Sequence, residues 1–217
     1  MSDPTPDPYE PEREELANSV THGLGVVLSI AGLAWLVAAV ASRGDAWHMT
    51  GVVIFGVTLV LLYASSALYH GVRRGRLKQI FLRCDYAGIF LLIAGTYTAV
   101  LLLNLRDALG LGLLALVWVL CLGGVVLVMN FRFPGHFRLA ATFIYVALGW
   151  LVLAVIKPLA AVLPGLSIRF LLLGGVCYTS GVIFFLWRRL PYHHAIWHIF
   201  VLAGSACHWL AVAGSIQ

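Results

Sequence analysis

Three histidines in this sequence lie at the ends of long apolar segments, where an imidazole has few polar partners. His70 ends one such segment, and His194 and His198 begin another. Because polar side chains are costly in hydrocarbon, such residues usually belong to a functional site. Residues spaced i and i+4 share one face of a helix, so His194 and His198 can bind the same metal ion. Three imidazoles with an open fourth position are typical of catalytic zinc.

The segments that carry these histidines belong to a chain with the composition of a polytopic membrane protein. Of its 217 residues, 61% are hydrophobic and only 11% are charged, which is far from the average of soluble proteins. Seven apolar stretches each have close to the roughly 20 residues that cross a bilayer as a helix. They cover residues 16–41, 47–72, 84–105, 109–130, 138–157, 166–187 and 193–215. Since lipid offers the backbone no hydrogen-bond partners, the fold is predicted to be all-α.

The domain organisation follows from the same pattern. Residues 16–217 are predicted to form one transmembrane domain, and residues 1–15, which are rich in proline and acids, a disordered tail. No signal peptide is expected, because the residues before the first apolar stretch are acidic rather than basic.

The net charge of +5 does not indicate nucleic-acid binding, since the basic residues lie mainly in loops between spans. There they set the orientation of the chain.

The basic residues predict which side of the membrane each end of the chain occupies. Ten of the fourteen lysines and arginines lie on the side of the N-terminus, five of them in the loop 73–83. By the positive-inside rule, the N-terminus is predicted to be cytoplasmic and the C-terminus to lie outside. His70, His194 and His198 then share one depth near the cytoplasmic boundary, although more than a hundred residues separate His70 from the other two. We therefore expect the three to converge.

Other polar residues are predicted to lie at the same depth. Asp85 falls in the first turn of the third span and is the only acid inside a span. An intramembrane carboxylate normally has a cationic or metal-linked partner, so Asp85 is expected to orient or deprotonate a water molecule. Ser66, one turn before His70, could donate a hydrogen bond to a ligand, a water or an oxyanion, or bond back to its own helix. His22 and Asn18 are candidates for supporting the metal ligands.

Alternatives to a zinc site remain open at this stage. Each imidazole could be hydrogen-bonded inside the bundle, or lie at the headgroup interface, without any metal. Bis-histidine haem is a rival, but two ligands one turn apart on one helix favour a compact ion. All-imidazole ligation suits zinc, copper, nickel or iron, and zinc is the preferred prediction on geometry and availability. Zinc with three neutral ligands can lower the pKa of a water molecule to about 7.

Four ordered blocks of this sequence resemble the hemolysin III family. That family belongs with the progestin and adipoQ receptors and, more distantly, with the alkaline ceramidases. The blocks are ELANSVTHGLG from Glu15, SSALYH ending at His70, DYAGIF from Asp85, and PYHHAIWHIFVLAGSACHW from Pro191. The resemblance covers essentially everything after the tail.

The resemblance implies a seven-helix protein with a zinc site on the cytoplasmic side. The zinc ligands of the family correspond to His70, His194 and His198, and its serine and aspartate near the metal correspond to Ser66 and Asp85. Glu15, from the first block, joins His22 and Asn18 as a candidate for supporting the ligands. The family also implies chemistry like that of a lipid amide hydrolase, and a multi-pass protein of the bacterial plasma membrane.

Three functions are predicted in order of preference. The first is a zinc-dependent hydrolase of a lipid amide or ester, with Asp85 as base and Ser66 positioning the water or the oxyanion. The alternative is a non-catalytic sensor or regulator of membrane lipid composition, in which zinc only ties helices together. Structural zinc usually has four protein ligands, so a fourth side chain would support that alternative. The third is cytolysis, which the family name implies. Membrane lipids are the expected partners.

Overall fold

Long helices account for nearly all of the residues that the computed structural model describes, which are 12–42, 45–130 and 135–216, with side chains described outside 135–138. The elements are α1 (Glu12–Ala41), α2 (Ala46–Gly71), α3 (Arg76–Asn104), α4 (Ala108–Asn130), α5 (Gly135–Trp150), the 3-10 helix η1 (Leu151–Val155), α6 (Ile156–Val162), α7 (Gly165–Leu186) and α8 (His193–Gly214). Seven helical stretches are long and apolar enough to cross a membrane. The predicted all-α polytopic fold is confirmed.

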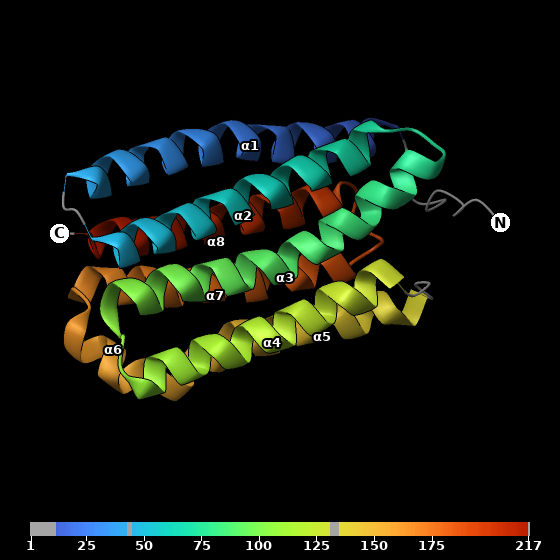
Figure 1. Ribbon diagram of the computed structural model, residues 1–217. Coiled ribbons are helices and arrows are strands. Elements are labelled where there is room, and N and C mark those ends of the chain that lie inside the picture. Colours follow the sequence, from blue (N-terminus) through green and yellow to red (C-terminus); the bar gives the residue numbers. More distant parts are fainter. Residues whose placement is uncertain (1–11, 43–44, 131–134, 217) are drawn as a thin grey trace.

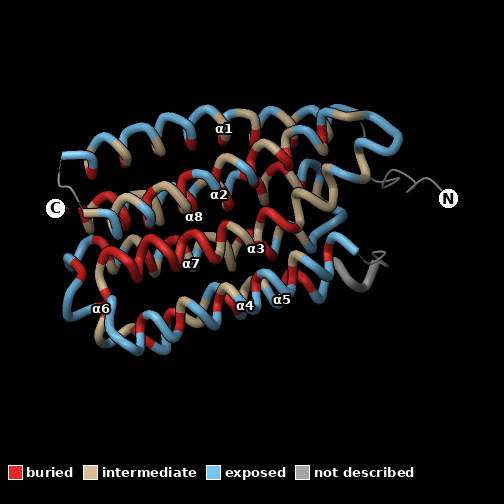
Figure 2. The backbone as a smooth tube through the Cα atoms, in the orientation of Figure 1, coloured by how far each residue is buried: buried red, intermediate tan, exposed pale blue. Residues whose placement is uncertain are grey.

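The helices run up and down side by side, and the start of α1 and the end of α8 lie at opposite ends of the bundle (Figure 1). Helix α3 is the most enclosed: 78% of its apolar window is buried, against 22% for α1. In Figure 2 the buried residues accordingly follow α3, while the outer faces of α1 and α4 are exposed. Exposed leucine and valine side chains on those outer faces suit contact with lipid tails.

Two helix starts differ from the positions that the sequence predicts. Helix α1 begins at Glu12, four residues inside the predicted tail, and residues 1–11 lie outside the described part of the chain. Acids in a first helical turn interact favourably with the helix dipole, so Glu12–Glu15 can extend the helix. Helix α3 begins at Arg76, eight residues earlier than expected, because arginine, lysine and glutamine are good helix formers although they are not apolar. Asp85 therefore lies in the third turn of α3, and its predicted place in the first turn was wrong.

The fifth span is interrupted. Its α-helix stops at Trp150, and a 3-10 segment connects it to α6. Pro158 in α6 explains the change of geometry, since proline lacks an N–H group and its ring crowds the carbonyl four residues before it. The hydroxyl of Tyr97 on α3 donates to the carbonyls of Leu148 and Gly149, at 3.0 and 3.1 Å. These bonds satisfy backbone groups next to the interruption.

Close contact between α2 and α3 depends on Gly95. A Cβ atom at this position would lie 2.2 Å from Thr58 Oγ1, and that hydroxyl already donates to the carbonyl of Phe55 at 2.8 Å. We expect Gly95→Ala to lower the free energy of unfolding by about 1–3 kcal/mol, because the helices must separate to admit the methyl group. The measurement is the thermal unfolding midpoint of the purified protein in detergent.

The control for this prediction is Gly123→Ala on α4. A Cβ atom there would meet nothing within 4 Å. Alanine is also the better helix former, so no loss of stability is expected. Equal destabilisation by the two substitutions would contradict the role assigned to the contact between Gly95 and Thr58.

Candidate metal centre

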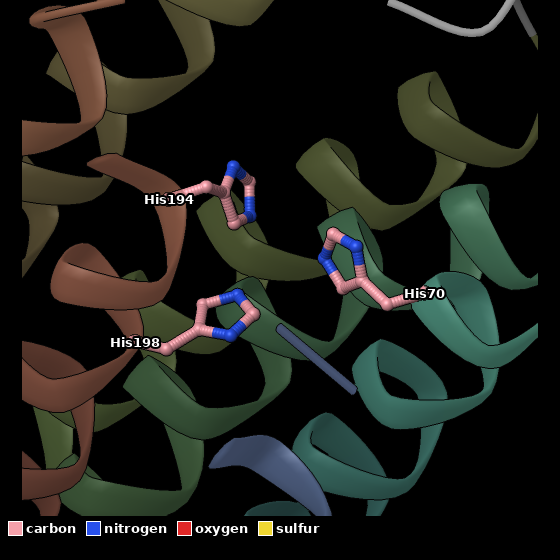
Figure 3. Close-up of side chains that lie close together, drawn as sticks. All are labelled: His70, His194 and His198. Atoms are coloured by element: carbon pink, nitrogen blue, oxygen red, sulfur yellow. The ribbon is translucent and has the colours of Figure 1, made fainter. Parts of the chain in front are cut away.

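His70, His194 and His198 lie together at one end of the bundle, and their rings point toward one another (Figure 3). His70 is in the last turn of α2, and the other two are in the first two turns of α8. One candidate ligand atom from each lies within 4.8 Å of the other two. The ring centroids are 4.7 to 5.2 Å apart. The expected convergence is found, while the binding of a metal stays a prediction.

The hydrogen bonds of His70 leave one ring nitrogen directed to this centre. Its Nδ1 lies 2.6 Å from Glu15 Oε2, so the imidazole donates to the carboxylate. Its Nε2 is buried and has no hydrogen-bond partner. A histidine whose outer N–H is held by a carboxylate is fixed in tautomer and orientation, and it is a stronger metal ligand.

His198 is held in the same way by the first helix. Its Nδ1 lies 3.2 Å from the carbonyl of Asn18 and 3.1 Å from Thr21 Oγ1. Because a carbonyl only accepts, Nδ1 carries the proton, and Nε2 keeps its lone pair for a ligand role. The Thr21 hydroxyl itself donates to α1 carbonyls, at 2.9 Å from each of Ala17 and Asn18. Helix α1 thus orients a ligand on α8.

His22 and Asn18, the other two supporting candidates on α1 besides Glu15, lie beside the centre. The ring of His22 stacks on that of His198, with centroids 3.4 Å apart and planes 13° from parallel. Nitrogen lone pairs lie in the ring plane, so two stacked rings cannot direct them at one ion. His22 therefore supports His198 rather than sharing an ion with it in this arrangement. Asn18 is fully buried, and its side-chain oxygen and nitrogen have no hydrogen-bond partner.

Asp85 and Ser66 line a cavity of about 460 Å³ together with the three histidines. Asp85 is not one of the three residues whose ligand atoms cluster. Ser66 is fully buried, and its Oγ has no hydrogen-bond partner. It therefore does not bond back to its own helix, unlike its neighbour Ser65, whose hydroxyl donates to the carbonyl of Leu62 at 2.9 Å. The Ser66 hydroxyl instead interacts with the carboxylate of Asp85, and both side chains line the cavity.

Lys78 contributes a contact that the sequence alone did not reveal. Its Nζ lies 2.9 Å from Glu15 Oε1 and 3.2 Å from the carbonyl of Tyr69, and 4.7 Å from the centre of the Tyr69 ring. Glu15 thereby connects α1 to both α2 and α3. The signal was hidden because Lys78 falls in a basic run that hydropathy assigns to a loop. Extending α3 back to Arg76 brings Lys78 into its first turn, beside the end of α2.

Comparisons with known proteins agree with this architecture. The family model described as "Haemolysin-III related" matches residues 12–209. The chain is 46% identical over 200 residues to the hemolysin-3 homolog of Bacillus subtilis (strain 168). The alignment covers 92% of this chain and 93% of that protein. The chain is 43% identical over 200 residues to hemolysin-3 of Bacillus cereus, covering 92% and 90% respectively. The protein belongs to the haemolysin-III related family and is a multi-pass membrane protein.

A more distant relative extends this similarity to animals. The monocyte to macrophage differentiation factor of Homo sapiens is 31% identical over 210 residues, covering 92% of this chain and 83% of that protein. The resemblance inferred from the four sequence blocks is therefore confirmed at the level of the family.

The bond between Glu15 and His70 generates a test of the metal centre. Glu15→Gln keeps the size of the side chain but removes the charge, so the substituted residue holds the His70 N–H less well. We expect zinc affinity to fall by about 10–100-fold, as is usual when such a supporting group is lost. The measurement is titration of the purified protein with zinc against a competing chelator.

Glu12→Gln is the matched control on the same helix. The Glu12 side chain is 84% exposed, and its oxygen lies 3.9 Å from an equally exposed Arg73. Its loss should leave zinc affinity unchanged. An equal effect of the two substitutions would show that helix charge, and not the hydrogen bond to His70, governs binding.

Proposed function

We propose that this protein is a zinc-dependent hydrolase that cleaves an amide or ester bond of a membrane lipid. The observation that carries the proposal is the convergence of His70, His194 and His198 at the polar end of a cavity whose walls are otherwise mainly apolar. Lipid pockets need apolar walls for the chains, and a hydrolytic site needs a few convergent polar groups. Both occur here in one cavity.

The three histidines suit a zinc ion, and hydrogen bonds on the outer nitrogens of two of them prepare those two as ligands. His70 donates to Glu15 and His198 to Asn18, so each has a nitrogen lone pair left for the metal. The buried, unpartnered Nε2 of His70 is the clearest sign of a missing ligand. When bound, zinc would supply Lewis acidity, polarising a carbonyl oxygen or lowering the pKa of a water molecule to about 7.

The surrounding side chains would provide the remaining chemistry. Asp85 would accept a proton from the attacking water and later return it to the leaving group. The Ser66 hydroxyl would donate a hydrogen bond to the oxygen on which negative charge develops. The lining along α3 runs from Leu82 to Val100, which at 1.5 Å per residue is about 27 Å. That depth accommodates a long acyl chain and excludes bulk water from the polar end.

We infer that this chemistry takes place at the cytoplasmic face of the plasma membrane. The start of α1, the connection between α2 and α3 and the connection between α7 and α8 share one end of the bundle (Figure 1). Most of the lysines and arginines of the sequence belong to that end. The positive-inside rule therefore supports a cytoplasmic location for the polar end of the cavity.

A sensor of lipid composition with purely structural zinc is supported less well. Structural zinc normally has four protein ligands. Neither His22 nor Asp85 belongs to the cluster of ligand atoms in the described part of the chain, and the cavity extends directly from the three histidines. Cytolysis, which the names of the relatives suggest, would require an action on other membranes, whereas seven spans hold this chain in its own.

The decisive substitutions are His70→Ala and Asp85→Asn. Wild-type protein in detergent should contain about one zinc per chain and release fatty acid from a panel of lipid amides and esters. His70→Ala should lose both properties, whereas Asp85→Asn should keep zinc and lose about 10²–10⁴-fold in rate, since only the base is removed. Elemental analysis and mass spectrometry of the released acids are the measurements. Zinc retained without turnover of any lipid by the wild type would favour the sensor.

Two adjacent serines separate a catalytic effect from a general one. Ser66→Ala removes a hydroxyl that faces the cavity, and we expect a rate loss of about 10²–10³-fold with unchanged zinc content. Ser65→Ala removes a hydroxyl that bonds within its own helix and does not line the cavity, so the rate should stay the same. If both variants were equally slow, Ser66 would have no special part in the reaction.

A further inference from the structure

One of the two charged residues that line the cavity has no part in the proposed hydrolysis. Asp85 and Arg188 are the only residues with formal charges among the described residues that line it. Arg188 lies in the connection between α7 and α8, is exposed, and forms no ion pair within the described chain. An arginine at the mouth of a cavity without a carboxylate partner is free to bind an anionic group from outside.

The backbone of this connection is well fixed. Arg188 N donates to the carbonyl of Leu186 at 3.0 Å, Leu190 N to that of Trp187 at 2.9 Å, and His193 N to that of Leu190 at 3.1 Å. These bonds use only main-chain atoms. The backbone of Arg188 is therefore fixed at the cavity lining, and the hydrogen bonds of the turn do not use its guanidinium.

The start of α8 supplies a second feature beside Arg188. Its preceding residue, Tyr192, has a φ of 58° and provides no side-chain cap for the first turn. His193, the first residue of the helix, also lines the cavity and is only 7% exposed, yet its Nδ1 has no hydrogen-bond partner. A helix N-terminus with uncapped N–H groups attracts anions. A buried, unpartnered imidazole next to it indicates that a ligand supplies the missing hydrogen-bond partner.

We infer that Arg188, His193 and the first turn of α8 bind the phosphate of a lipid headgroup at the mouth of the cavity. The guanidinium fork matches two phosphate oxygens, and the imidazole of His193 donates one N–H. The apolar depth of the same cavity holds the chain of that lipid. The Asp85 carboxylate disfavours an anion beside it, so the phosphate is placed at the arginine end and a neutral amide or ester linkage nearer the histidines.

This inference rests on the proposed function in naming its substrate class, but binding can be measured without turnover. The probes are lysophosphatidic acid and a monoacylglycerol with the same acyl chain, added to the purified full-length protein in neutral detergent at fixed ionic strength. The lipids differ only in the phosphate. We expect the phosphate lipid to bind at least about tenfold more tightly, as a charge-assisted bidentate contact would produce.

Arg188→Gln should reduce that preference to about twofold or less, and His193→Ala should reduce it in part. Arg189→Gln is the matched control, because Arg189 is the next residue, is also exposed, and does not line the cavity. It should keep the full preference. Equal loss in Arg188→Gln and Arg189→Gln would overturn the inference in favour of general surface charge. Unchanged zinc content and unfolding midpoint show that each variant is folded.

Three further outcomes are decisive. Inorganic phosphate that displaced lysophosphatidic acid at equal concentration would assign the site to free phosphate and overturn a lipid headgroup. No preference between the two lipids in the wild type would overturn the inference even if lipid hydrolysis were found. Conversely, a preference that depends on Arg188, without hydrolysis of any lipid, would support this site and contradict the proposed enzymatic function.

Discussion

The requirement that buried polar groups find hydrogen-bond partners controls how this bundle presents its histidines. In lipid, an imidazole without a hydrogen-bond partner is energetically costly. Here the outer nitrogen of His70 is bonded to Glu15 and that of His198 to the carbonyl of Asn18. Both partners come from α1, so the first helix fixes the tautomers of residues on α2 and α8. Within the described residues, the inward Nε2 of His70 is left without a partner, and that asymmetry makes this end of the bundle a candidate metal centre.

The same constraint bears on the charged residues in the first turns of α1 and α3. Lys78 on α3 binds Glu15, and Glu15 binds His70. A lone carboxylate at this depth would be costly, but one shared between a lysine and an imidazole has all its charge matched. Three helices therefore meet at a single side chain. This contact adds to the apolar packing along α3 in holding α1, α2 and α3 together.

The helices and the histidine cluster could be predicted from the sequence, because hydropathy and the i, i+4 spacing are properties of residues that are close together in the chain. The start of α3 was not, since hydropathy cannot distinguish a charged helical turn from a charged loop. For the same reason the part played by Lys78 stayed hidden. The side of α1 on which His22 faces its neighbours could not be predicted either, because it depends on how α1 is oriented about its axis relative to α8. The structure resolves it as a stack of His22 on His198.

The geometry of α8 also explains why two consecutive histidines have different environments. Neighbouring residues on a helix point about 100° apart, so His194 can face the cluster while His193 turns toward another part of the same cavity. Their ring centroids are 6.1 Å apart, with planes inclined by 73°. One helical turn thus provides an imidazole to the candidate metal centre and another to the proposed phosphate site. A lipid held at its headgroup by the start of α8 would have its linkage placed close to the metal ligands of the same helix, without any movement of the bundle.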